Sequence, residues 1–187
     1  MSALRIGSLC SGYGGLDLAV VTVLNADLAW CAETDQHCRA VLAARFEGVP
    51  NLGDITAVDW ADVPPVDMVT AGWPCQDISL AGQGAGIKEG TRSGLWFCIT
   101  ACLRQLRPAG VFLENVASLR IRGLARVLAD LARLGYDAQW ATVRASEVGA
   151  PHERARLFVL AVRPGFPDRL LSTAHPAGPR SSRRAAS

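Results

Sequence analysis

The chain has 187 residues, 50% hydrophobic and 19% charged, which suits one globular domain and excludes wholesale disorder. No apolar run reaches the roughly 18–20 residues that span a bilayer, and no secretory signal is recognisable, so we expect a soluble, cytoplasmic protein without membrane contact. Residues 1–91 carry four basic and eleven acidic side chains, whereas residues 92–187 carry fifteen and six. Almost all the basic residues are arginine, so the second half favours an anionic polymer as partner. Codon bias toward arginine in a GC-rich genome is an equally good explanation of the arginine content.

Strands and helices are expected to alternate in the first half of the chain. The apolar pattern predicts strands over residues 4–9, 26–31 and 66–71. A helix over residues 16–24 follows the first strand, and Asp35 is expected to cap a second helix that runs to about residue 46. A glycine-rich loop then extends from residue 72 to residue 92.

The second half continues the alternation. Ser93 is expected to cap a helix that Pro108 ends, and a strand follows over residues 110–113. An apolar stripe from Leu124 to Leu134 predicts another helix, which Gly135 terminates. Residues 138–144 and 156–162 are expected to be closing strands. Residues 164–187 hold four Pro and four Arg and predict a flexible basic tail, which leaves residues 1–163 for the domain.

This alternation predicts an α/β fold with a mostly parallel, doubly wound sheet. Ligands of such sheets bind beyond the carboxyl ends of the strands. The segments at those ends are residues 10–15, Glu33, Asp54, 72–76 and 114–116. The candidate site is therefore expected to be assembled from these five segments.

A glycine loop follows the first strand. Gly12, Gly14 and Gly15 allow close approach of a ligand, and Glu33 lies where a carboxylate accepts from ribose hydroxyls. Asp17 stands where a dinucleotide fingerprint has its third glycine, so an adenosyl ligand such as S-adenosylmethionine fits better than NAD. Asp54 is a candidate acceptor for the adenine amino group, with a turn-forming role as the alternative.

The segment Gly72-Trp73-Pro74-Cys75-Gln76 follows the third strand. Pro74 stiffens the backbone, so Cys75 is a candidate nucleophile on a rigid loop above the ligand cleft. A small buried thiol is the usual alternative for a cysteine. The other five cysteines form no C-x-x-C pair, and we expect neither disulfides nor a metal site.

Two later segments add charged groups. Glu114, in Glu114-Asn115-Val116, is a candidate acid for a ring nitrogen, or else a helix cap. Arg154 and Arg156 alternate at the start of the last strand, so both forks are expected on one face, where they suit a phosphate or a base carbonyl. A solvated edge strand is the alternative.

Taken in order, four of these segments resemble a DNA (cytosine-5) methyltransferase. They are Cys10-Ser11-Gly12-Tyr13-Gly14-Gly15, Pro74-Cys75-Gln76, Glu114-Asn115-Val116 and His152-x-Arg154-x-Arg156. The resemblance covers residues 4–162. It implies a Rossmann-like methyltransferase fold, S-adenosylmethionine as cofactor, double-stranded DNA as substrate and a role in restriction-modification, in a prokaryote or encoded by a phage.

The resemblance also implies a role for each residue. Cys75 adds to C6 of a flipped cytosine, Glu114 holds N3 and the exocyclic amine, and Arg154 and Arg156 contact the base and its phosphate. The implied DNA contacts are Gln76, Arg92 and Asn115. The implied cofactor contacts are Cys10, Ser11, Gly12, Gly14, Gly15, Leu16, Glu33, Asp54, Ile55, Pro74 and Leu95.

Three departures from the family pattern stand out. The family usually has Phe where Cys10 stands, and often Gln where His152 stands. Nothing in the last residues resembles the family's target-recognition region or its final motif. A second polypeptide that supplies target recognition is therefore a candidate partner. The alternatives are a truncated, catalytically weak DNA-binding or decoy protein and, on the glycine loop alone, an NAD-dependent oxidoreductase.

Overall fold

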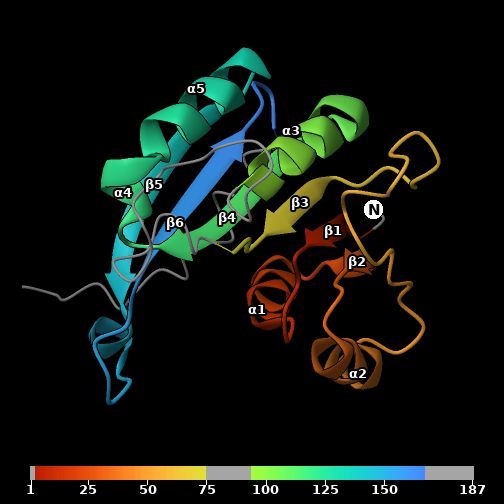
Figure 1. Ribbon diagram of the computed structural model, residues 1–187, viewed down its shortest axis with the longest axis horizontal. Helices are drawn as coiled ribbons and strands as arrows, with labels where there is room; N and C mark the ends of the chain where they lie inside the picture. Colours follow the sequence, from red (N-terminus) through yellow and green to blue (C-terminus); the bar gives the residue numbers. More distant parts are fainter. Residues whose placement is uncertain (1–2, 75–93, 167–187) are drawn as a thin grey trace, which may run out of the picture.

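A six-stranded sheet forms the centre of the computed structural model, which describes residues 3–74 and 94–166 (Figure 1). The strand order is β2-β1-β3-β4-β6-β5. The pairs β1–β2, β1–β3 and β3–β4 are parallel, whereas β6 is antiparallel to both β4 and β5. The expected α/β fold with a mostly parallel sheet is confirmed. The strands are β1 (Arg5–Leu9), β2 (Asp27–Ala32), β3 (Met68–Ala71), β4 (Gly110–Val116), β5 (Asp137–Arg144) and β6 (Ala155–Val162).

Helices cover the two faces of the sheet separately. The buried side chains of α3, α4 and α5 join one apolar core, and those of α1 and α2 join a second. Figure 1 shows α3 and α5 on one side of the sheet and α1 and α2 on the other. The sheet is therefore doubly wound, as expected. The helices are α1 (Gly15–Leu24), α2 (Gln36–Arg45), α3 (Leu95–Leu106), α4 (Leu119–Arg122) and α5 (Leu124–Arg133), with a short 3-10 turn, η2 (Ala145–Val148).

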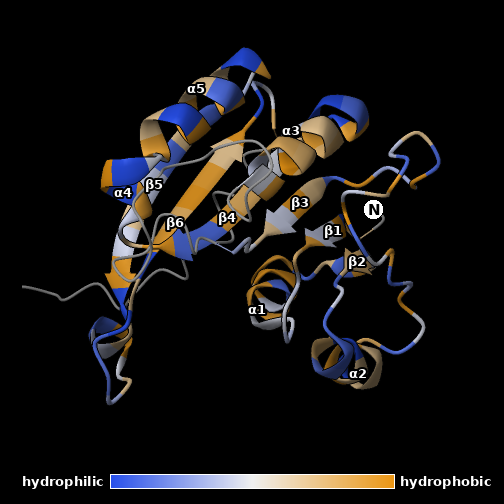
Figure 2. Cartoon of the chain, viewed as in Figure 1, coloured by the Kyte–Doolittle hydropathy of each residue, from blue (hydrophilic) through white to orange (hydrophobic). Residues whose placement is uncertain are grey.

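Local sequence signals explain where α2 begins and which face α5 buries. The Asp35 side chain accepts a hydrogen bond from the backbone N–H of Cys38 at 2.9 Å, which caps α2 as expected. Helix α5 buries Leu124, Val127 and Leu131 on one face, and Figure 2 shows its hydrophilic residues on the opposite face.

Strand β4 and helix α4 depart from the sequence prediction, and strand β3 begins at Met68, two residues later than expected. Strand β4 continues to Val116, three residues beyond Leu113, because β6 pairs with it as far as Val116 and Arg156. Helix α4 was not predicted, since four residues are too few for a periodic pattern. Helix α3 begins at Leu95 with Gly94 before it, and the expected cap Ser93 lies outside the described residues.

The first residues of the expected basic tail pack against the sheet. The backbone N–H of Phe166 donates to the carbonyl of Arg163 at 3.0 Å, and the Phe166 ring lies close to Gly110. Residues 167–187 lie outside the described residues. The border of the flexible tail at residue 164 therefore stays a prediction, and the chain is packed at least as far as Phe166.

One face of the sheet carries an apolar groove, which we call the α1-side groove. It has a volume of about 480 Å³ and lies between α1 and the strands β4 and β6. Phe112 lines it and stacks on Phe158 with ring centroids 5.8 Å apart. The groove lining includes Val20, Val23, Met68, Phe112, Leu160 and Val162.

Over residues 3–74 and 94–166, no helix is long and apolar enough to cross a membrane.

Candidate functional site

The chain reverses its winding direction at β1, which lies between β2 and β3 in the sheet. The loops after β1 and β3 therefore diverge and open a crevice at the carboxyl ends of the parallel strands. The glycine loop after β1 enters this crevice. Gly12 and Gly14 have φ angles of 54° and 73°, in the left-handed region that a side chain disfavours. Cys10 also has a positive φ, of 52°.

Glu33 anchors the glycine loop. Its Oε2 accepts a hydrogen bond from the backbone N–H of Gly12 at 2.7 Å. Its Oε1 accepts from the backbone N–H groups of Thr34 and Asp35 at 2.8 and 2.9 Å. The carboxylate thus ties the loop after β1 to the end of β2 while it faces the crevice.

Asp54 forms the turn considered for it and also lines the crevice, and its contact with an adenine amino group stays a prediction. Its Oδ1 accepts from the backbone N–H of Thr56 at 2.9 Å and from the Thr56 hydroxyl at 2.8 Å, which forms a turn. These hydrogen bonds hold the pKa of the Asp54 carboxyl below its usual range. The same residue lines the crevice, so a turn-forming aspartate presents a carboxylate to it.

A first pocket of about 450 Å³ collects most of the expected cofactor contacts. It is formed by the ends of β1 and β2, the segment around Asp54, the residues after β3 and the first residue of α3. Two carboxylates and a run of backbone polar groups suit the hydroxyls and amino group of a nucleoside. Its expected members are Cys10, Gly12, Glu33, Asp54, Ile55, Pro74 and Leu95.

A second pocket of about 540 Å³ adjoins the first and shares Cys10, Gly12 and Gly72 with it. The second pocket runs from the glycine loop to Glu114 and Arg154. The two pockets together connect the expected cofactor residues to the expected catalytic residues. Ser11, Gly15 and Leu16 also line the second pocket, whereas Gly14 packs beside Leu42 and Phe46 of the α1–α2 side.

Glu114 and Arg156 form an ion pair in the second half of the site. Arg156 Nε lies 2.6 Å from Glu114 Oε1, and both side chains are about three-quarters buried. Glu114 belongs to β4 and does not follow it, which corrects the predicted placement. Alternation along the antiparallel pair of strands puts both side chains on one face. Arg154 immediately precedes β6 and lines the second pocket.

Asn115 is buried and engaged within the protein. Its Nδ2 donates to the carbonyl of Trp73 at 3.1 Å, and its Oδ1 accepts from the backbone N–H of Val116. Its side chain points to the face opposite that of Glu114, so in this structure it holds the segment after β3. The proposed DNA contact of Asn115 stays a prediction that this hydrogen bond does not support.

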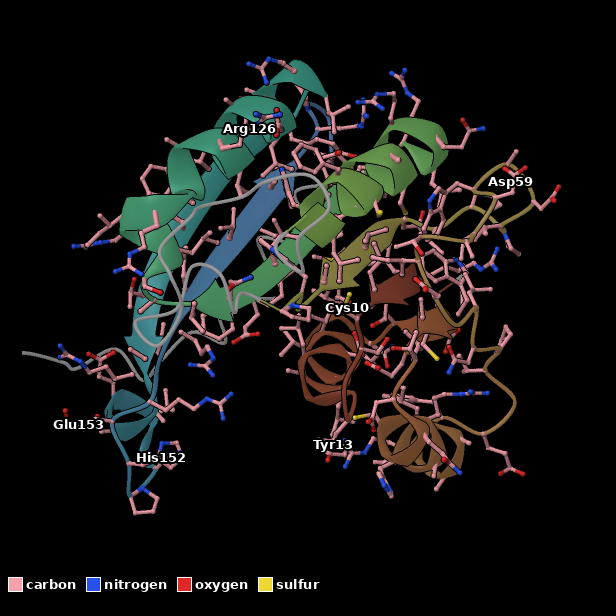
Figure 3. All side chains as sticks on the ribbon, in the orientation of Figure 1. Cys10, Tyr13, Asp59, Arg126, His152 and Glu153 are labelled. Carbon is pink, nitrogen blue, oxygen red and sulfur yellow. The ribbon has the colours of Figure 1, made fainter. Side chains whose placement is uncertain are left out.

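Three of the expected residues, Cys75, Gln76 and Arg92, lie outside the described residues. Figure 3 shows His152 and Glu153 at the tip of the β5–β6 connection, away from Cys10.

Burial controls the chemistry of Cys10. Desolvation, followed by the nearby Glu33, Cys98 and Asp54, raises the pKa of the Cys10 thiol to about 12. A thiol with this pKa is protonated at neutral pH and is a poor nucleophile. Cys10 therefore contributes shape and not reactivity to the pockets.

Sequence reasoning missed a buried polar cluster behind the glycine loop. Asp17 is 1% exposed, and its Oδ1 accepts from the Thr70 hydroxyl at 2.5 Å. The Ser8 hydroxyl donates to that of Ser11 at 2.7 Å. Burial raises the pKa of the Asp17 carboxyl, which lines the second pocket. The available signal was a single acidic residue in an otherwise apolar helix.

A family model and two curated relatives match most of this chain. Residues 4–183 match the family model described as C-5 cytosine-specific DNA methylase. The chain is 34% identical over 166 residues to the type II methyltransferase M.NgoBI of Neisseria gonorrhoeae, covering 87% of this chain and 50% of that protein. It is 32% identical over 170 residues to the type II methyltransferase M.DsaV of Dactylococcopsis salina, covering 89% and 46%.

The fold is also shared with solved structures. The Dnmt2 methyltransferase of S. pombe superposes with a TM-score of 0.70 at 20% identity, over 86% of this chain and 49% of that one. The chain spans about half the length of the curated relatives it matches. The match to the family model, over residues 4–183, includes all the residues that line the two pockets.

Proposed function

From the premise that this chain belongs to the C-5 cytosine-specific DNA methylase family, we propose that it is the catalytic part of an enzyme that methylates cytosine at C5 in DNA. The observation that carries the proposal is the continuity of the two pockets. A nucleoside-sized pocket with Glu33 and Asp54 opens at Cys10 and Gly12 into a second pocket with Glu114 and Arg154. One site thus holds a methyl donor and a base in contact.

The first pocket fits S-adenosylmethionine. Glu33 accepts from the ribose hydroxyls, Asp54 accepts from the adenine amino group, and Pro74 and Leu95 flank the ring. The Oδ1 of Asp54 already binds Thr56, so Oδ2 is the oxygen that receives the ligand. When bound, the cofactor supplies an electrophilic methyl group next to the second pocket.

The chain's own residues activate the base. The Cys75 thiolate attacks C6 of a cytosine flipped out of the duplex, and the electron pair of the C5–C6 bond moves into the ring. Glu114 hydrogen-bonds N3 and the exocyclic amine, which stabilises the charge that attack places on the ring. The activated C5 would be the carbon that accepts the donor's methyl group. Loss of the C5 proton to a water molecule would then return an electron pair to the C5–C6 double bond and expel Cys75 as the thiolate.

Arginines orient the reacting groups. Arg156 holds Glu114 through their ion pair, and Arg154 stands at the pocket where the base enters. The basic second half of the chain binds the phosphates of double-stranded DNA through salt-sensitive contacts, to which Gln76 and Arg92 contribute. Type II methyltransferase relatives favour a role in restriction-modification.

Target recognition is proposed to come from a second polypeptide. Base readout needs side chains in the grooves of DNA, beyond what a pocket supplies. The α1-side groove exposes apolar side chains of β4 and β6 on the face that carries Glu114. We propose that the second polypeptide packs an apolar segment there.

The deciding experiment traps the covalent step. A duplex that contains 5-fluorocytosine is incubated with the chain, the second polypeptide and S-adenosylmethionine, because fluorine cannot leave C5 as a proton does. An adduct that survives denaturing electrophoresis and disappears in Cys75→Ser is the expected result. An adduct that Cys75→Ser leaves unchanged would contradict the proposal, and complete absence of adducts would favour a DNA-binding protein without turnover.

A further inference from the structure

Two tryptophans stand directly behind the walls of the first pocket. Trp73 precedes Pro74 and Trp96 follows Leu95, and Pro74 and Leu95 both line the pocket. The two indole rings are tilted against one another with centroids 5.2 Å apart. Trp73 is 3% exposed and Trp96 is fully buried. The separation of the two pocket walls is thus set by one aromatic contact in the core.

Each indole is fixed by a further element. Trp96 Nε1 donates to Asp130 Oδ2 of α5 at 3.0 Å, and Asp130 also pairs with Arg126 and Arg133. The carbonyl of Trp73 accepts from Asn115 of β4 at 3.1 Å. Trp73 is therefore held by the hydrogen bond to its carbonyl and by the contact of its ring with Trp96. Trp96 is held by the hydrogen bond from its indole N–H and by its place in α3.

Within the described residues, the Trp73 indole contributes packing and its N–H makes no polar contact. Its Nε1 is buried and has no hydrogen-bond partner within the described part of the chain. A buried indole N–H normally finds a partner, because leaving it unpaired costs free energy. The ring is kept here for its contact with Trp96.

We propose that Trp73 and Trp96 are positioning residues for methyl-donor binding, because their ring contact joins the two segments that carry Pro74 and Leu95. The nucleoside contacts Pro74 and Leu95, so its affinity depends on the spacing that the tryptophan pair sets between these two segments. This inference rests on the proposed cofactor and adds residues that touch neither cofactor nor base.

The structure offers a matched control pair. Trp30 and Trp60 belong to the same apolar core, with ring centroids 6.0 Å apart, and Trp30 is fully buried. Trp30 Nε1 donates to the carbonyl of Pro64 at 3.1 Å, as Trp96 Nε1 donates to Asp130. Neither residue lines the first pocket. Trp30→Phe therefore removes a comparable ring and hydrogen bond away from the pocket walls.

The experiment measures affinity for S-adenosylhomocysteine by calorimetry, together with the melting temperature, in the full chain. Trp96→Phe and Trp30→Phe are expected to lower the melting temperature to a similar degree. Trp96→Phe and Trp73→Phe weaken binding about fivefold, the scale of one aromatic pair, and the double variant loses less than the product of the two. Trp30→Phe leaves affinity unchanged. Ligand-induced change in tryptophan fluorescence is lost in the first two variants and kept in Trp30→Phe.

A second series covers the case in which a tryptophan variant does not fold. Asp130→Ala leaves the Trp96 indole without its acceptor and is expected to weaken binding, and Asp130→Asn, whose amide oxygen still accepts, restores the affinity. Equal affinity loss in Trp30→Phe and Trp96→Phe, or unchanged affinity in both pocket-side variants, would overturn the inference alone. Failure of the wild-type chain to bind S-adenosylhomocysteine would overturn the proposed cofactor and the inference with it.

Discussion

Two carboxylates in this protein hold local backbone structure and also line a pocket. Glu33 accepts three backbone hydrogen bonds and lines the first pocket. Asp54 closes a turn with one oxygen and lines the same pocket. A structural role leaves room for the proposed ligand role, because each carboxylate has two oxygens with several lone pairs.

The double role of Glu33 predicts a double effect of its removal. Glu33→Ala frees the backbone N–H groups of Gly12, Thr34 and Asp35 and is expected to cost about 1–2 kcal/mol of folding free energy. S-adenosylhomocysteine at a hundredfold excess over its dissociation constant stabilises the wild type by ~2.7 kcal/mol, and the variant should lose most of this shift. Thermal denaturation with and without ligand measures both effects. A full ligand shift in Glu33→Ala would refute the ribose contact.

Cysteine chemistry provides a second test at this scale. Burial raises the pKa of Cys10 and Cys102 to about 12 and that of Cys31 to about 11. At pH 8 only about one Cys10 thiol in ten thousand is ionised, so iodoacetamide should not label these three residues in the folded chain. Peptide mass spectrometry before and after denaturation checks this. Labelling of Cys10, which is partly exposed in the pockets, would contradict its raised pKa.

The raised thiol pKa values predict a loss of folding stability at high pH. A thiol whose pKa is raised on folding contributes fully to folding stability below its unfolded pKa, near 9. This contribution is lost as the pH rises from 9 through the pKa of the folded state. Stability is therefore expected to fall between pH 9 and about 12 through Cys10, Cys31 and Cys102.

At the scale of elements, hydrophobic pattern and turn residues predicted nearly every strand and helix. The end of β4 was misjudged, because Glu114-Asn115-Val116 becomes strand only through pairing with β6, a contact distant in sequence. The tryptophan pair was missed for the same reason, since Trp73 and Trp96 lie in separate elements. The segments expected at the strand ends do line the two pockets, although Glu114 lies within β4. Their hydrogen bonds within the protein, such as that of Asn115, depend on packing and could not be predicted.

Asp130 joins α3 to α5 and predicts a pH dependence. Burial raises its pKa, but hydrogen bonds from Arg126 and Trp96 and the charges of Arg126 and Arg133 outweigh that and lower it below the usual 3.8. A lowered pKa stabilises the fold above the unfolded pKa and is lost as pH falls through the folded one. Asp130→Asn should thus be less stable by about 0.5–1 kcal/mol at pH 7. In urea titrations the difference should begin to shrink as pH falls below about 3.8 and should vanish only below the lowered pKa of the folded state; a constant difference would exclude an ionic origin.

The pairing of β1 and β2 depends on a glycine that no turn requires. A methyl group on Gly7 would overlap Cζ2 and Cη2 of the fully buried Trp30. Gly7→Ala is expected to cost about 1–3 kcal/mol, since the packed ring has little room to move. Gly15→Ala is the control, because no atom lies within 4 Å of its added methyl. Urea unfolding compares the two, and equal stability would show that Trp30 can repack.

The whole molecule has two unlike sides. The face under α3 and α5 is filled, whereas the face that carries Glu114 continues into the α1-side groove. Doubly wound sheets are stable when both faces are covered. Within the described residues, the apolar side chains that line the groove favour association with a further apolar segment.

Association is expected to control activity. Radiolabelled methyl transfer to mixed-sequence duplex DNA should be weak with the chain alone and strong when the product of the neighbouring reading frame is added. Val23→Asp, at a 56% exposed position on the rim of the groove, should abolish the stimulation without a loss of stability. Val148→Asp, at a 75% exposed position in η2, is the matched control. Site-specific methylation by the chain alone would contradict the need for a partner.

Side chains along β4 and β6 alternate between the two faces of the sheet, and this alternation limits where residues can be inserted or deleted. Glu114 and Arg156 meet because each points to the same face of the sheet. One residue inserted between Val111 and Glu114 would turn the carboxylate toward α5 and leave every other strand intact. At the tip of the β5–β6 connection, where Figure 3 places His152 and Glu153, an inserted residue changes no side-chain face. Insertions and deletions should therefore accumulate at that tip among descendants of this gene, whereas the seven residues of β4 keep their number.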